Sequence, residues 1–416
     1  MSTNPHDLDI KAFDYHLPDE RIARYPLEKR SKSALLVYRN GAIGHRIFDQ
    51  IGTELPADCL LVMNETRVMN ARLEFFTDSG ARIELFCLEP AAGVLPTEAL
   101  QSEREVEWTV MVGNKKRWSQ QVLSRDLPQS MGGGRLCVER VSDMGRELRV
   151  RFFWDTPGVR FAEVLEAAGE LPLPPYLKRK ADAEDASRYN TVYARISGSV
   201  AAPTAGLHFS PELLEELRGR GCSTLNVRLH VGAGTFMPVS ASRLEEHDMH
   251  SERIDVDIDS IRALASQACK GKILAVGTTS MRTLESLYWY GLRCMLGAPE
   301  RGDLLVDQWD PYQPHDRELP AASAVLEFLA NHLHAHGKSS LMGRTRLLIA
   351  PGYDFKLVDL LLTNFHQPGS TLLLLVAAFI GEDWRRCYSY ALEHQFRFLS
   401  FGDASLLVRT QQANAG

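Results

Sequence analysis

The sequence predicts an α/β protein that is interrupted by an all-β module. Between residues 70 and 155, apolar and polar side chains alternate with the period of two that β-strands show. On both sides of this stretch, short apolar strands alternate with segments of helical periodicity. Several of these strands end in loops rich in Gly, Thr, Asn and His. Together these observations predict an α/β domain, formed from two separate parts of the chain, with a β-domain inserted into it.

The inserted module shows the clearest alternation. Its strongest strand signals are residues 83–87, 105–112 and 148–154, with a glycine turn at 132–134. All-β segments of this kind commonly close into a small barrel. We therefore place the inserted β-barrel at residues 70–155, the α/β domain at 1–69 and 156–410, and a terminal tail at 411–416.

The loops that follow the predicted strands carry the residues best suited to chemistry. The densest is the loop at residues 200–209, which leads into a helix start at Ser210 and Pro211. Similar loops follow other strands, at residues 232–236, 277–280 and 363–370. Because ligands of α/β folds bind beyond the carboxyl ends of the strands, we expect these loops to contribute to a binding site.

Several short stretches, spread along the chain, carry a family resemblance. They are residues 64–68, 171–176, 189–193, 200–209, 229–236, 247–251, 275–280 and 363–366. Each is weakly specific alone, but unrelated chains would not share all of them in this order. On these motifs the chain resembles the S-adenosylmethionine:tRNA ribosyltransferase-isomerases of queuosine biosynthesis. The resemblance implies a large α/β barrel-like domain, discontinuous in sequence, with a small inserted all-β barrel.

The resemblance also implies a transferase and isomerase that uses S-adenosylmethionine as a ribosyl donor. The acceptor would be 7-aminomethyl-7-deazaguanine at the tRNA anticodon wobble position, and the products epoxyqueuosine in tRNA, adenine and methionine. Such a reaction needs a base for the C5′ proton, which the sulfonium acidifies, and an acid for the departing adenine. The implied partners are S-adenosylmethionine as co-substrate and tRNA, with no metal and no further cofactor.

Histidines in the motif loops are the candidates for proton transfer, because their ordinary pKa lies near neutrality. His208, in the densest motif, is the first choice, and His230 is the second. His250 is the third, with Glu252 to orient or deprotonate it. For any single one of these residues a structural role is an equal alternative, and the sequence does not distinguish the acid from the base.

The substrate-binding candidates lie in the same loops. Hydroxyls and free N–H groups at the start of a helix form an anion site, with an arginine close by, that suits a methionine carboxylate or a tRNA phosphate. A structural cap is the alternative there. Glycines allow close approach of the nucleoside, and an asparagine side chain suits a base edge. The candidates are Arg67, Thr204, Gly206, Gly232, Gly234, Thr235, Thr278, Thr279, Ser280, Arg282, Asn364 and His366.

Composition narrows the class of protein. The net charge of −6 argues against broad nonspecific binding of nucleic acid, although a local basic patch would suffice for tRNA. Candidate patches, with solvated surface charge as the alternative, are residues 21–32, 115–117 and 178–180, and Trp118 and Tyr176 next to them could stack bases. The polar N-terminus and seven cysteines without a Cys-x-x-Cys pair predict a cytoplasmic protein with reduced thiols. We expect a monomer with no membrane partner.

Residues 289–344 form a longer connection than the resemblance leads us to expect. Within it His332, His334 and His336 suggest a metal site, but their spacing and the lack of a nearby Cys or acidic cluster to complete a site favour a surface helix. Two alternative functions remain open, of which the insertion motivates the first. One is a paralogous S-adenosylmethionine-dependent pentosyltransferase with a different acceptor, and the other is a non-catalytic RNA-binding module.

Overall fold

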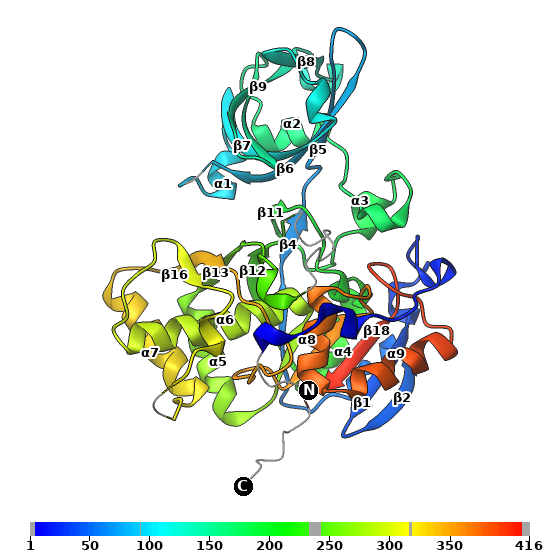
Figure 1. Cartoon of the computed structure of the whole chain (residues 1–416), viewed down its shortest axis with the longest axis vertical. Helices are drawn as coiled ribbons and strands as arrows, with labels where there is room; N and C mark the ends of the chain where they lie inside the picture. Colours follow the sequence, from blue (N-terminus) through cyan, green and yellow to red (C-terminus); the bar gives the residue numbers. More distant parts are fainter. Residues whose placement is uncertain (1–4, 92, 233–242, 316–317, 410–416) are drawn as a thin grey trace.

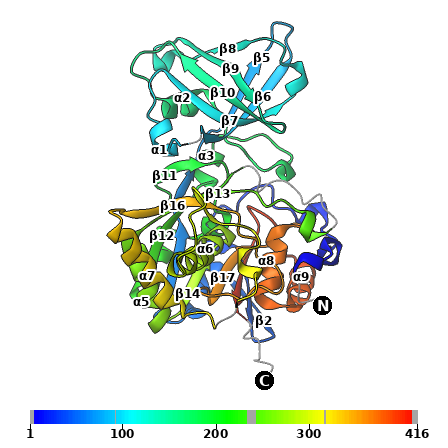
Figure 2. The ribbon, with the colours of Figure 1, turned by 60° about the vertical axis from the view of Figure 1, so that its left-hand side comes forward.

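The computed structural model describes residues 5–91, 93–232, 243–315 and 318–409. It consists of a large α/β unit and a small β-barrel that stands on one end of it (Figures 1 and 2). The chain enters the barrel after β4 (Thr66–Val68) and returns before β11 (Ile196–Ser199), and these two short strands pair in parallel. The predicted α/β class with an inserted barrel is therefore confirmed.

A ten-stranded mixed sheet organises the large unit, in the order β15-β16-β13-β12-β3-β14-β17-β18-β1-β2. Its central strands β12, β3, β14 and β17 are parallel. The strands are β1 (Ala34–Arg39), β2 (Ala42–Ile47), β3 (Leu60–Asn64), β12 (Ser223–His230), β13 (Glu252–Asp257), β14 (Ile273–Val276), β15 (Leu304–Val306), β16 (Ser340–Thr345), β17 (Leu360–Asn364) and β18 (Ala404–Val408).

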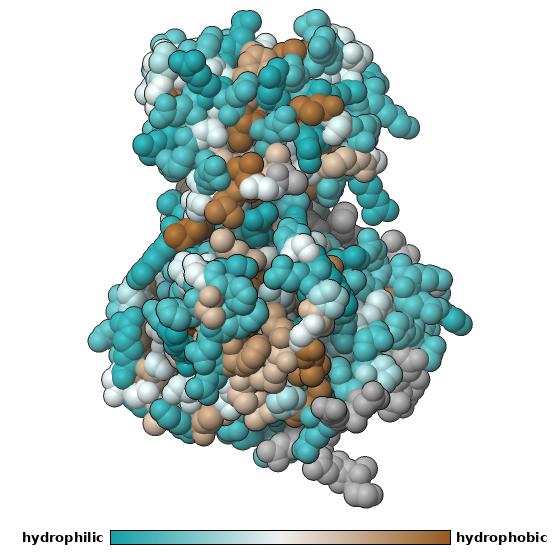
Figure 3. Space-filling model, turned by 90° about the vertical axis from the view of Figure 1, so that its left-hand side faces the viewer, coloured by the Kyte–Doolittle hydropathy of each residue, from teal (hydrophilic) through white to brown (hydrophobic). Residues whose placement is uncertain are grey.

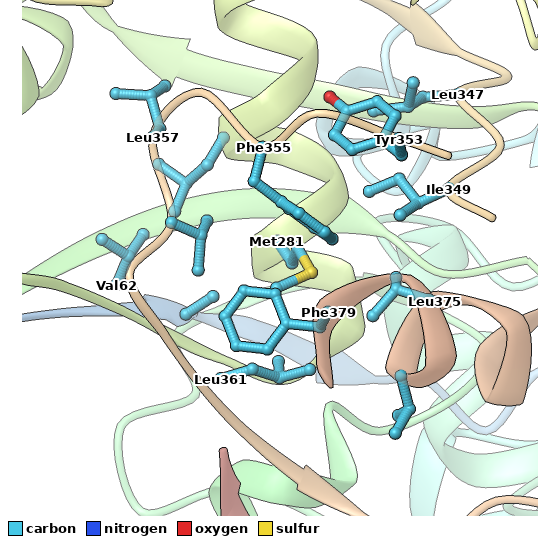
Figure 4. Close-up of a cluster of buried hydrophobic side chains, with 14 of the residues drawn as sticks. Val62, Met281, Leu347, Ile349, Tyr353, Phe355, Leu357, Leu361, Leu375 and Phe379 are labelled. Atoms are coloured by element: carbon cyan, nitrogen blue, oxygen red, sulfur yellow. The ribbon is translucent and has the colours of Figure 1, made fainter. Parts of the chain in front are cut away.

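Helices cover both faces of this sheet, which explains why β3 and β14 are buried along their whole length. Val62 of β3 packs with the larger core, whereas its neighbour Leu61 packs with the core on the opposite face. The helices are α4 (Pro211–Gly219), α5 (Ile258–Lys270), α6 (Thr278–Met295), α7 (Ala322–Ala335), α8 (Thr371–Ile380) and α9 (Asp383–Glu393). In the larger core, Met281 of α6 and Phe379 of α8 lie together (Figure 4).

Six antiparallel strands form the barrel, in the order β5-β6-β7-β10-β9-β8. They are β5 (Arg72–Phe76), β6 (Arg82–Pro90), β7 (Glu105–Gly113), β8 (Val122–Asp126), β9 (Arg135–Asp143) and β10 (Glu147–Trp154). Alternate residues of β10 are buried, as the period-two pattern predicts. At the remaining edge, Arg125 of β8 donates to the carbonyl of Glu74 in β5 (3.1 Å).

Short helices accompany the barrel and its connections. α1 (Pro96–Ala99) lies between β6 and β7, and α3 (Asp185–Arg188) lies in the return connection. α2 (Phe161–Ala168) packs its apolar face into the barrel core, where Phe161 contacts Trp108. The buried cluster of the barrel unit therefore continues to Ala168, past residue 155.

The long connection at residues 289–344 belongs to the large unit. β16 pairs with β13, and α7 packs against α5 and α6, so the segment extends the sheet and its helical layer. The predicted helix is confirmed as α7, and the rings of His332 and His336 lie against each other at a tilt at its exposed end. Within the described residues, no group of three or more His, Cys, Asp or Glu could hold a metal ion, and no helix is long and apolar enough to cross a membrane.

Candidate active site

A cavity of about 540 Å³ lies beyond the carboxyl ends of the central parallel strands. Val231 follows β12, Gly277 follows β14 and Asn364 ends β17, and all three line the cavity. The sheet topology thus brings together two of the loops that the sequence singled out, at residues 277–280 and 363–370, with the 200–209 loop beside them. Thr204, His250, Glu252, Thr278, Thr279, Arg282, Asn364 and His366 are the predicted residues that line it.

One wall is built around a buried ion pair. Arg282, in the first turns of α6, pairs with Glu252 at the start of β13, and the two side chains expose 5% and 1% of their surface. The guanidinium Nε of Arg282 also donates to the carbonyl of Leu347 (3.0 Å). Nη2 of Arg282 has no hydrogen-bond partner among the described residues. The other carboxylate oxygen of Glu252 lies 3.5 Å from Nε2 of His250, so Glu252 links the arginine to an imidazole in the cavity.

The start of α6 forms the neighbouring part of the wall. Its first N–H groups have no intrahelical acceptor, and Gly277, with φ +91°, precedes the helix without a side-chain cap. Thr278 and Thr279 line the cavity, and the buried Oγ1 of Thr279 has no partner in the described part of the chain. Ser280 differs, because its hydroxyl donates to the carbonyl of Val276 (2.9 Å) and does not face the cavity. Of the residues predicted for an anion site, Thr278, Thr279 and Arg282 therefore line the cavity.

His208 lies behind the cavity and does not line it, contrary to its rank as first catalytic candidate. Its Nε2 accepts from the side-chain amide of Asn364 (3.2 Å), which leaves the proton on Nδ1 to be donated to Ser33 Oγ (2.8 Å). Burial, with the positive charges of Arg397 and Arg30, lowers the pKa of His208 to about 3. The neutral ring thus holds Asn364, whose Oδ1 accepts from the hydroxyl of Thr204 (2.8 Å) at the cavity surface.

His366 lines the cavity but is held by its neighbours. Its Nε2 lies 2.8 Å from Oγ1 of Thr363, its carbonyl accepts from the hydroxyl of Tyr15, and its N–H donates to Tyr388 (3.1 Å). Burial lowers the pKa of His366 to about 3, so the ring is neutral near pH 7. A neutral imidazole of this kind serves as a hydrogen-bonding group.

His230, the second catalytic candidate, lies on the side of β12 that faces β11. Its ring packs so closely on Gly198 that a Cβ there would lie 2.5 Å from Nδ1 of His230. Burial lowers the pKa of His230. The ring lies outside the cavity lining because the extended strand directs it away from the strand end.

The remaining candidates are dispersed. Gly206 packs against Tyr193, whose hydroxyl would lie 1.9 Å from an added Cβ, so this glycine has a packing role. Arg67 is exposed and lines a separate cavity of about 160 Å³ between the two units. Gly232 follows Val231 but does not line the main cavity. Gly234 and Thr235 lie outside the described residues.

Several lining residues were not among the site candidates. His247 lines the cavity beside His250, and burial and the charge of His250 lower its pKa. Tyr176 also lines the cavity, and its hydroxyl lies 2.5 Å from Oγ of Ser400. Burial raises the pKa of Tyr176 to about 12. The motifs at 247–251 and 171–176 mark two of these residues, but nothing in the sequence places Ser400 beside them.

The fold and this cavity together define the class of protein, an α/β enzyme with an inserted β-barrel and a polar site beyond its parallel strands. The chain belongs to the family of queuosine biosynthesis proteins, which it matches over residues 10–407. The family resemblance seen in the sequence motifs is therefore confirmed.

Individual relatives agree with this family. Two proteins named S-adenosylmethionine:tRNA ribosyltransferase-isomerase, from Heliobacterium modesticaldum and Pelobacter propionicus, are 38% identical over 96% of this chain and 100% and 99% of their own. One of the same name from Staphylococcus saprophyticus is 37% identical over 96% of this chain and its whole length. The solved S-adenosylmethionine tRNA ribosyltransferase from Thermotoga maritima is 28% identical, covers 95% of this chain and 99% of its own, and has a TM-score of 0.45.

Proposed function

We propose that this chain transfers and isomerises the ribosyl group of S-adenosylmethionine onto 7-aminomethyl-7-deazaguanine in the tRNA anticodon. The products would be epoxyqueuosine-tRNA, adenine and methionine. The observation that carries the proposal is the convergence of Arg282, Glu252, His250 and the start of α6 on one cavity. The relatives that bear this activity in their names, at 37–38% identity over nearly the whole chain, support it.

The methionine carboxylate of S-adenosylmethionine fits the start of α6. Thr279 and Arg282 line the cavity, and Oγ1 of Thr279 and Nη2 of Arg282 have no hydrogen-bond partner among the described residues. The N–H groups of the first turn of α6 have no intrahelical acceptor. Such a set of donors, at the positive end of a helix dipole, favours a carboxylate. We place the methionine end of the co-substrate there, rather than a phosphate of the RNA.

The pair formed by Asn364 and Thr204 suits a nitrogen base or the acceptor amine. The amide nitrogen of Asn364 donates to His208, and the hydroxyl of Thr204 donates its proton to Oδ1 of Asn364. What remains at the cavity surface are oxygen lone pairs, which accept hydrogen bonds. They match the N–H groups of adenine or of the aminomethyl group, while Tyr176 on another part of the lining offers an aromatic surface.

We assign proton transfer to His250, with Glu252 as its partner. His250 lines the cavity, and its Nε2 lies beside a carboxylate that pairs with Arg282. A carboxylate in this position orients the imidazole and stabilises the positive charge that forms when the ring takes a proton. His208 and His366, with pKa values lowered to about 3, are too weak as bases for this step and serve to position other groups.

The two units would divide the work. We propose that residues 1–69 and 169–410 form the catalytic domain, and that residues 70–168, which include α2, form the inserted barrel domain, so that its expected end at residue 155 moves to the end of α2. Because tRNA is the proposed acceptor, we also propose that the enzyme acts in the cytoplasm.

The test is release of adenine from S-adenosylmethionine by the purified protein. It is run with and without an anticodon stem-loop that carries 7-aminomethyl-7-deazaguanine, followed by mass analysis of the RNA. We expect adenine release that depends on the RNA, and an RNA mass increased by the ribosyl-derived group. Adenine release that leaves the RNA mass unchanged, or no release with this acceptor, would contradict the proposal.

A further inference from the structure

The inserted barrel contributes directly to the cavity. Arg146, in the turn between β9 and β10, is the one described residue of the six-stranded barrel that lines it. Its side chain is exposed and makes no ion pair or hydrogen bond with the described part of the chain. A free arginine at the edge of a cavity that Glu246 and Asp248 also line is available for an anionic partner.

The turn that presents Arg146 has a fixed shape. Nζ of Lys115 donates to Oδ1 of Asp143 (2.7 Å) and to the carbonyl of Gly145 (2.8 Å). The same carboxylate oxygen accepts from the N–H of Gly145 (2.9 Å), where the backbone has φ +87°. The ammonium of Lys115 lowers the pKa of Asp143. The turn is therefore ordered before any ligand binds, which reduces the entropy lost on binding.

Two of the three cations at residues 115–117, next to this turn, make no ion pair with the described residues. Lys115 is neutralised by Asp143, but Lys116 and Arg117 are exposed and make no ion pair with the described residues. We refer to Lys116, Arg117 and Arg146 as the barrel tip. Trp118 is not available for base stacking here, because it is buried with the guanidinium of Arg140 over its ring (4.7 Å).

A contact between the units holds the barrel in place. Arg344 of β16 donates from Nη1 to Oε2 of Glu89 in β6 (2.7 Å). Burial raises the pKa of Glu147, beside the Arg146 turn, and the charge of Glu89 adds to this while Arg344 opposes it. Between the units the molecule narrows to a waist (Figure 3). The barrel tip is thus positioned relative to the cavity by an ion pair and not only by the connecting strands.

Several cations of the other two basic runs, at residues 21–32 and 178–180, form ion pairs with carboxylates of the chain itself. Lys178 and Arg24 both pair with Asp19, and Arg179 pairs with the buried Asp185. These contacts bring residues 21–32 and 178–180 together, but they consume much of the positive charge. Lys29 and Lys180 of those runs are also exposed and make no ion pair with the described residues, so the barrel tip is distinguished by Arg146, which lines the cavity.

We propose that the barrel tip binds backbone phosphates of the RNA substrate at the mouth of the cavity. This inference rests on the proposed function, which requires one nucleotide to enter the cavity while its flanking phosphates stay outside. The chain has a net charge of −6, so RNA must be attracted by local unpaired cations rather than by the overall field. Arg146 would contact the phosphate nearest the target nucleotide, and Lys116 and Arg117 would contact phosphates further along the strand.

The test compares Arg146→Ala with Arg135→Ala in the full-length protein. Arg135 lies at the opposite end of β9, so the Arg135→Ala substitution removes the same charge from the same barrel. RNA affinity is measured over a series of salt concentrations, with KM for the RNA and for S-adenosylmethionine. For Arg146→Ala we expect a roughly three- to tenfold weaker RNA affinity, a salt slope reduced by about one, and an unchanged KM for S-adenosylmethionine.

Further variants separate charge from folding. Arg146→Lys should restore most of the affinity, and Lys116→Ala with Arg117→Ala should lower the salt slope further. If Arg146→Ala, folded by circular dichroism, binds RNA as tightly as Arg135→Ala does, the inference is wrong. RNA binding is measured directly, without catalysis, so this test can fail independently of the proposed function. The proposed function fails if the wild-type protein shows no RNA-dependent release of adenine.

Discussion

Replacing Arg282 with methionine should destabilise the large unit strongly. The change keeps much of the side-chain length but leaves the carboxylate of Glu252, which is 1% exposed, without its arginine. It also removes the donor to the carbonyl of Leu347. Loss of one partner of a buried ion pair costs about 3–5 kcal/mol, because the other charge remains buried and uncompensated.

The free energy of unfolding is measured by urea denaturation, followed by a signal from the large unit. The matched control is Arg262→Met, which breaks an exposed pair with Asp259 on α5 and should change stability by less than about 1 kcal/mol. Adding Glu252→Gln to Arg282→Met should recover part of the loss, since the buried charge is then gone.

The pH dependence of the stability of Arg282→Met provides a second, independent test of the buried ion pair. In Arg282→Met, burial would raise the pKa of Glu252 in the folded state above its unfolded value. The unfavourable charge is then present above that raised pKa and is removed as the pH falls through it. The stability difference between variant and wild type should therefore shrink in mild acid. A loss below about 1 kcal/mol at pH 7, or no recovery in the double variant, would refute the reasoning.

Other predictions concern the histidines and the core. His250→Ala should lower single-turnover adenine release by roughly 10²- to 10⁴-fold with little change in S-adenosylmethionine affinity, and near-normal release would remove it from proton transfer. His208→Ala should lower activity by releasing Asn364, but the pH profile of the remaining activity should keep its shape, whereas loss of one limb would show that His208 titrates in the reaction. Because His208 and His366 have folded pKa values of about 3, wild-type stability should fall as the pH drops from about 6.5 towards 3, and a flat acid profile would contradict this burial. Met281→Ala should cost about 2–5 kcal/mol in urea denaturation, and a loss under about 1 kcal/mol would mean that the core refills the space.

The parts of the fold that depend on local periodicity were predictable from the sequence. The strands of the barrel are buried on one face, so Val150 and Phe152 alternate with partly buried residues and the pattern is visible within a few positions. The ends of β14 and β17 were marked by apolar runs that stop at Gly277 and Thr363. The meeting of these strand ends at one cavity followed from the general geometry of parallel sheets.

Side-chain direction was not predictable in the same way. His208 belongs to the densest motif, yet the 3-10 helix at Thr204–His208 turns its ring behind Asn364 and towards Ser33, which is distant in sequence. His230 is directed away from the site by its place on the strand. The linkage of Glu252 to Arg282 depends on β13 and α6 meeting in space, a tertiary relation that sequence spacing does not encode.

The central claim is that the cavity at the strand ends binds S-adenosylmethionine with its carboxylate at the start of α6 and its ribose beside His250. The most direct measurement is a crystal structure of the protein with S-adenosylmethionine bound. We predict electron density for the methionine carboxylate against Thr278, Thr279 and Arg282, with the C5′ carbon within reach of the His250 ring. Density for the co-substrate elsewhere, such as in the smaller cavity beside Arg67, would contradict the account.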